Sequence, residues 1–149
     1  TSIGRPVYGG GGIMPDIFVP QDTSDYTSYY KMAVMNGMLQ KFAFDYTDHN
    51  RRHLKEYASV DMLEKYLKGQ GLLEQFARYA HKRGLKRRNN MLYKSRALFE
   101  ESLYGNIIYN MLGMEEYIKF LNATDPAVLR AVEVLEKGES VPKVVKSEE

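Results

Sequence analysis

The chain has 149 residues, of which 44% are hydrophobic and 27% are charged, and its formal net charge is +2. This composition is typical of an ordinary globular protein with one hydrophobic core, and so small a charge gives no sign of a nucleic-acid partner. The lack of cysteine excludes disulfide bonds and thiolate metal sites, and no apolar run approaches the roughly 20 residues that span a bilayer.

Residues 1–22 form a leader that is rich in glycine and proline. It holds five of the twelve glycines and three of the five prolines. Proline lacks a backbone donor and glycine weakens regular structure, so we expect loop and at most one or two short strands. The run Ile17-Phe18-Val19 before Pro20 predicts such a strand. Because two strands alone are rarely stable in water, we expect the leader to belong to a sheet whose other strands lie outside this chain.

A helical pattern follows the leader. Apolar residues recur at helical spacing from Tyr30 to Tyr46, which predicts a first helix over about residues 24–48. A final helix is predicted to start at Asp125-Pro126, because Asp is a good N-cap and Pro suits the first helical position. Similar start, stop and spacing signals predict the intervening helices over residues 60–68, 72–84, 87–112 and 114–121.

These elements predict a mainly α-helical bundle of about five or six helices, preceded by an extended leader. We assign residues 1–22 to the leader, residues 23–138 to a helical domain and residues 139–149 to a flexible polar tail.

The four glycines at positions 9–12 raise the question of phosphate binding. A phosphate loop requires lysine and serine or threonine leading into a helix, so that amides, ammonium and hydroxyl converge on the anion. Here Gly12 is followed by Ile13-Met14-Pro15, and proline has no backbone donor to offer. We therefore favour a closely packed strand or turn.

Asp45, His49 and His53 are spaced four residues apart and could meet at a metal ion if one helix carried all three. In zinc peptidases, however, glutamate directly follows the first histidine, where this chain has Asn50. We also expect the helix to break near residues 48–51. A solvated helix end is therefore favoured, and we expect no metal and no cofactor.

Lys82, Arg83, Lys86, Arg87 and Arg88 form a basic cluster. Such a cluster can contact nucleic acid or an acidic surface. Acidic residues elsewhere nearly balance it, so we favour a solvated turn with cations near a helix C-terminus and expect no nucleic-acid partner.

Two serine–lysine pairs, Lys94–Ser95 and Ser28–Lys31, could suggest nucleophilic catalysis. A catalytic pair needs a lysine of lowered pKa beside the hydroxyl, together with an oxyanion hole. Neither pair has such an environment in the sequence, so we predict that these residues lie on helix surfaces.

Two short motifs stand out in the leader. A Thr-x-x-Gly-Arg segment opens the chain, and a glycine run leads into a Gly-Ile-x-Pro-Asp segment. The residues of the two motifs are Gly4, Arg5, Tyr8, Gly9, Gly10, Gly11, Gly12, Ile13, Pro15 and Asp16. This pattern resembles the end of the peptidase domain in the carboxyl-terminal processing, or tail-specific, serine proteases, in the form found in Bacteroidetes.

The resemblance implies an enzyme that hydrolyses peptide bonds in protein substrates with a serine nucleophile and a lysine general base. In that family both residues precede the Gly-Arg segment, so no residue of this chain takes either role. We expect a C-terminal fragment that is inactive alone, with a helical region after the peptidase domain. The resemblance also implies a periplasmic or cell-envelope location for the parent protein.

The alternative is a non-catalytic helical module for protein interaction or oligomerisation. It rests on the tyrosines and on Met32, Met35 and Met38 in the first predicted helix, because aromatic residues and methionine are enriched at interfaces. We predict that these methionines lie in the core or at an interface, and a homo-oligomer remains open. Nucleic-acid binding through residues 82–88 is the weakest of the three hypotheses.

Overall fold

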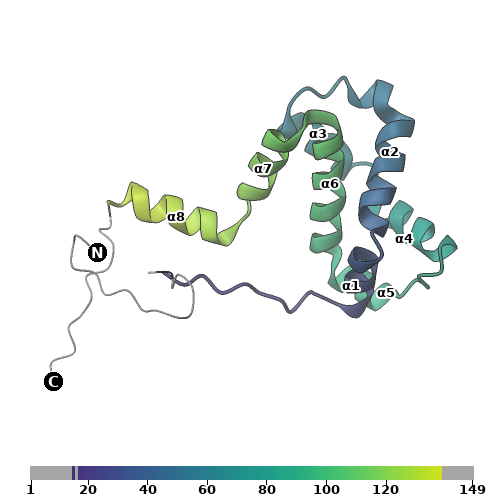
Figure 1. Ribbon diagram of the computed structural model, residues 1–149, viewed down its shortest axis with the longest axis horizontal. Coiled ribbons are helices and arrows are strands. Elements are labelled where there is room, and N and C mark those ends of the chain that lie inside the picture. The colour runs from purple at the N-terminus through teal and green to yellow at the C-terminus, as the bar shows by residue number, and fades with distance from the viewer. Residues whose placement is uncertain (1–14, 16, 139–149) are drawn as a thin grey trace. The chain divides into compact units, whose positions relative to one another are not determined.

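The computed structural model describes Pro15 and residues 17–138, which form eight α-helices and no β-strand (Figure 1). The predicted mainly helical fold is confirmed. Residues 17–19 pair with no other described segment. Because the predicted partner strands lie outside this chain, the strand at Ile17–Val19 stays a prediction. The predicted extended leader, residues 1–22, falls mostly outside the described residues.

The chain divides into two compact units, one of which comprises Asp22–Thr124. The other contains the helix α8 (Pro126–Glu136), and the predicted helical domain spans the first unit together with α8. Within the described part of the chain, no helix combines the length and the apolar character that crossing a membrane requires. The first unit consists of α1 (Ser28–Met35), α2 (Met38–Leu54), α3 (Val60–Lys68), α4 (Leu72–Lys82), α5 (Asn89–Lys94), α6 (Arg96–Leu112) and α7 (Met114–Asn122).

Two of the expected long helices are each divided in two. The first is interrupted at Gly37, whose φ of 62° lies in the left-handed region that favours glycine, so that α1 and α2 are separate helices. The second is interrupted at Ser95, between α5 and α6. The expected break near residues 48–51 is wrong, because α2 continues without interruption to Leu54.

Side chains accept hydrogen bonds from the first backbone N–H groups of several helices. The Thr27 hydroxyl accepts from the N–H of Tyr30 at the start of α1, and Asp125 Oδ1 accepts from the N–H of Ala127 and of Val128 at 2.7 and 3.0 Å. The predicted start of the last helix at Asp125-Pro126 is therefore confirmed.

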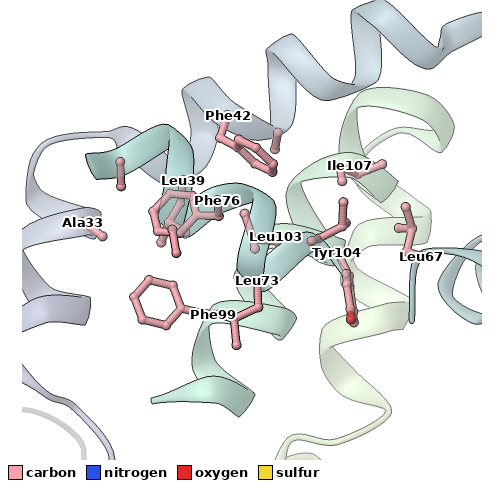
Figure 2. Packing of buried hydrophobic residues seen from close by; sticks show 14 of the residues in the cluster. Ala33, Leu39, Phe42, Leu67, Leu73, Phe76, Phe99, Leu103, Tyr104 and Ile107 are labelled. Carbon is pink, nitrogen blue, oxygen red and sulfur yellow. The ribbon is translucent and has the colours of Figure 1, made fainter. Parts of the chain in front are cut away.

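The core of the first unit surrounds α6, which contacts α2, α3, α4 and α7. Aromatic rings occupy its centre: the Phe76 ring centroid lies 5.7 Å from that of Phe42 and 5.3 Å from that of Phe99 (Figure 2). The Tyr29 ring centroid lies 5.8 Å from that of Phe99. Among the described residues, all the buried apolar side chains fall between Tyr29 and Phe120. This core fixes α2 and α4 relative to each other.

The helices α6 and α7 approach closely at Gly105. A Cβ atom at this position would lie 3.0 Å from the Tyr117 ring and 3.4 Å from the Phe120 ring. The missing side chain of Gly105 therefore leaves space for the aromatic face of α7.

Candidate functional site

The leader motif can be located only in part. Pro15 is exposed, and the other motif residues, Gly4, Arg5, Tyr8, Gly9, Gly10, Gly11, Gly12, Ile13 and Asp16, lie outside the described residues. Candidate sites in the structure therefore come from the helical unit.

The three metal-site candidates lie on one continuous helix, α2, but do not converge on one point. His49 Nδ1 lies 2.6 Å from the carbonyl oxygen of Asp45, and His53 Nδ1 lies 3.5 Å from the Glu56 carboxylate. A search of the described residues finds no group of three His, Cys, Asp or Glu side chains that could hold a metal ion.

His53 instead belongs to an aromatic cluster that the sequence analysis missed. The rings of Tyr57 and Tyr66 are stacked with their centroids 4.4 Å apart, and the His53 ring meets both at steep angles, 5.6 and 5.1 Å away. Tyr46 lies close to Tyr66. Its pKa is raised, mainly because the side chain is buried and to a smaller extent because of the nearby Tyr66 hydroxyl. The cluster joins the end of α2 to α3.

Ser95 does not lie on a helix surface, so that prediction is wrong. Its side chain is fully buried, whereas Lys94 is exposed. Ser95 Oγ donates to the carbonyl oxygen of Asp25 at 2.5 Å. The Thr27 hydroxyl, 2.7 Å away, therefore donates to Ser95 Oγ. This serine hydrogen-bonds the residues before α1 to the junction of α5 and α6, and no lysine activates it.

The second serine–lysine pair lies on a helix surface, as predicted, because Ser28 and Lys31 are both exposed on α1. Ser28 Oγ donates to the sulfur atom of Met91 at 3.4 Å.

Arg87, from the predicted basic cluster, forms a two-point ion pair with Glu74 of α4. Its two terminal nitrogens lie 2.7 and 3.0 Å from the two carboxylate oxygens, and the Tyr93 hydroxyl donates to the same carboxylate at 2.8 Å. The hydrogen bonds from Arg87 and, to a smaller extent, from Tyr93 lower the pKa of Glu74. This network ties the loop after α4 to both α4 and α5.

Arg83 from the same cluster stacks on an aromatic ring. Its guanidinium carbon lies 3.6 Å from the centroid of the Tyr79 ring, which is a favourable cation–π arrangement. Both residues line an open groove of about 320 Å³, which we call the α2–α4 groove. Its lining residues are Phe42, Gln75, Arg78, Tyr79, Lys82 and Arg83.

The methionines of the first predicted helix divide into two groups. Met38 packs against the core, whereas Met32 and Met35 on α1 are 50% and 85% exposed. Phe44 on α2 is also 58% exposed. Exposed methionine and aromatic side chains indicate a binding surface better than scattered small apolar residues do, because binding surfaces are enriched in these two kinds of side chain.

Comparison with known proteins gives one match. Residues 29–113, more than half of the chain, match a family of unknown function, DUF8443. The chain belongs to this family. The matched region starts in α1 and ends after α6, so it contains Ser95, the Glu74–Arg87 pair and the α2–α4 groove. No curated protein and no solved structure is significantly similar to the chain.

Proposed function

We propose that this member of DUF8443 is the C-terminal part of a carboxyl-terminal processing serine protease, in which residues 22–124 form a non-catalytic accessory domain. The observation that carries the proposal is the leader motif from Tyr8 to Asp16, which resembles the end of that peptidase domain. The parent enzyme would hydrolyse peptide bonds of protein substrates with a serine and a lysine located before Thr1. The same resemblance would imply a periplasmic or cell-envelope location for the parent protein.

A separately packed helical unit directly after the motif is compatible with this arrangement. Its buried residues provide a core within 29–120, so we expect the unit to fold without side chains of a peptidase domain. An accessory domain of this kind can position substrate, cover an active site or hold subunits together.

Expression of the complete reading frame tests the proposal. We expect it to encode a serine and a lysine before Thr1, and the purified protein to degrade labelled casein. Alanine in place of that serine should abolish degradation, while the 149-residue chain alone should leave casein intact. Absence of the serine and lysine, or degradation that survives the serine substitution, would overturn the protease assignment.

A second candidate function is a protein-interaction or oligomerisation module, favoured by the exposure of Met32, Met35 and Phe44. Sedimentation velocity over a wide concentration range tests it. If this surface joins two copies, Met32→Ser with Met35→Ser should weaken self-association. Met62→Ser on α3, where the side chain is about as exposed as that of Met32, serves as the control. A monomer at every concentration would exclude the oligomerisation role.

A further inference from the structure

Positive charge in the helical unit is concentrated in one stretch of the sequence. Residues 75–99 contain eight lysines and arginines and no aspartate or glutamate. In the remainder of the unit, residues 22–74 and 100–124, twelve acidic residues outnumber eight lysines and arginines. The basic stretch comprises most of α4, the loop after it, α5 and the start of α6.

Two carboxylates neutralise only part of this charge. Glu74 is occupied by Arg87 and Tyr93, and Glu100 lies 2.7 Å from Arg96. Arg78 and Lys82 are exposed, and no ion pair with either is found among the described residues. These two cations lie four residues apart on α4, so they project from the same side of the helix.

Both cations line the α2–α4 groove, where they lie beside apolar and hydrogen-bonding groups. Arg83 adds a third cation, held over the Tyr79 ring, and Gln75 adds an amide. The ring of Phe42 forms the floor of the groove but is only 7% exposed, because it belongs to the core. The groove therefore offers mainly donors for carboxylates.

We propose that the α2–α4 groove binds an acidic polypeptide segment. Carboxylates of the segment accept hydrogen bonds from Arg78 and Lys82. Charge complementarity selects this ligand, because the lining of the groove contains three cations and no carboxylate. The inference rests on the groove alone and does not depend on the protease assignment.

Exposure determines where the ligand carboxylates bind. The Tyr79 hydroxyl oxygen is buried, so a ligand does not reach it. Arg78 and Lys82 are exposed and are therefore the preferred contacts.

The aromatic packing disfavours a nucleic acid as the ligand. Single strands bind largely by stacking their bases on exposed aromatic faces. Arg83 covers a face of the Tyr79 ring, and the rings of Phe42 and Phe76 pack against Tyr79 with centroids 5.2 and 6.5 Å away. The acidic excess outside residues 75–99 would also repel a long polyanion.

Fluorescence anisotropy with the full chain tests the proposal. The probe is a fluorescein-labelled peptide of three Asp-Leu repeats, and its control carries Asn in place of Asp. We expect saturable binding of the acidic probe and about tenfold weaker binding of the control. Arg78→Gln with Lys82→Gln should weaken binding of the acidic probe about tenfold, because two charge-assisted contacts are lost.

A second double variant separates local contacts from net charge. Lys55→Gln with Lys65→Gln removes the same charge at exposed positions directly after α2 and on α3, and should change binding less than about twofold. Equal losses in the two variants would overturn the proposal. So would failure to bind the acidic probe.

Two further outcomes would assign the groove to another partner and overturn the proposal. One is tighter binding of a labelled oligo(dT) strand that the Arg78 and Lys82 substitutions abolish. The other is self-association in sedimentation that the same substitutions abolish, without peptide binding. Circular dichroism verifies folding, and the single variant Lys82→Glu repeats the test if the double variant is unfolded.

Discussion

At the scale of single residues, Ser95 shows how a small polar side chain can hold distant segments together. Its hydroxyl donates to the Asp25 carbonyl, and it accepts from both the hydroxyl and the backbone N–H of Thr27. The donor and both acceptor sites of the serine are thus used inside the protein.

Ser95→Ala should therefore lower the free energy of unfolding by about 1–3 kcal/mol, because buried polar partners lose their hydrogen bonds. Urea denaturation at neutral pH measures this change. Ser28→Ala is the matched control, since Ser28 is exposed, and should shift stability by less than about 0.5 kcal/mol. Similar values for both variants would show that the Ser95 contacts do not stabilise the fold.

The Glu74–Arg87 pair predicts a pH-dependent contribution to stability. The pKa of Glu74 in the folded protein lies below its usual value of 4.5, so the folded state binds a proton less readily than the unfolded chain. The contribution is complete above pH 4.5 and is lost as the pH falls through the folded-state pKa.

Glu74→Gln should accordingly be less stable than the parent chain at pH 7, by about 1 kcal/mol or less since the pair is partly exposed. The difference in urea midpoint should shrink as the pH is lowered below 4.5 and through the folded-state pKa of Glu74. Glu101→Gln, at an exposed carboxylate on α6, should show no such convergence. A difference between parent and Glu74→Gln that stays constant with pH would exclude this ion pair as its source.

At the scale of elements, local signals predicted helix content well and helix interruptions poorly. The start at Asp125-Pro126 was predictable because capping depends on adjacent residues. The interruption at Gly37 was missed because apolar residues keep helical spacing on both sides of it. Ser95 was misplaced because its partner Asp25 lies 70 residues away in the sequence.

The candidate site also depends on contacts that local sequence patterns do not predict. The basic cluster was visible in the sequence, but the Glu74–Arg87 pair joins residues 13 apart that no local pattern connects. The division of this cluster between an ion pair, a ring contact and the α2–α4 groove appears only when α4, its following loop and α5 are placed together.

Gly37 permits a testable statement about the interruption between α1 and α2. A Cβ atom there meets no neighbour within 4 Å, so the backbone conformation alone determines the effect of substitution. Gly37→Ala should lower the free energy of unfolding by about 1 kcal/mol, and Gly37→Asn by less, because asparagine tolerates positive φ better. Urea denaturation measures both variants.

Gly69 provides the comparison for Gly37. Its φ of −80° is accessible to any residue, so Gly69→Ala should be nearly neutral. If Gly37→Ala is equally neutral, the left-handed conformation at the α1–α2 junction is not required for stability.

At the scale of the whole molecule, the distribution of buried residues indicates which part of the chain folds independently. The described core lies between Tyr29 and Phe120, whereas α8 contributes no buried residue. We therefore predict that a polypeptide of residues 22–124 folds cooperatively alone, with a free energy of unfolding within about 1 kcal/mol of the full chain.

The cut before Asp22 keeps the Asp25 carbonyl that Ser95 binds, and the cut after Thr124 keeps all of α7. Urea denaturation followed by far-ultraviolet and near-ultraviolet circular dichroism provides the measurement, because coincident transitions indicate one cooperative unit. A polypeptide starting at residue 29 instead would lack Asp25 and Thr27, and should be less stable by at least as much as Ser95→Ala. If residues 22–124 have helical content but no cooperative transition, the core between Tyr29 and Phe120 does not suffice, and residues outside this unit must complete it.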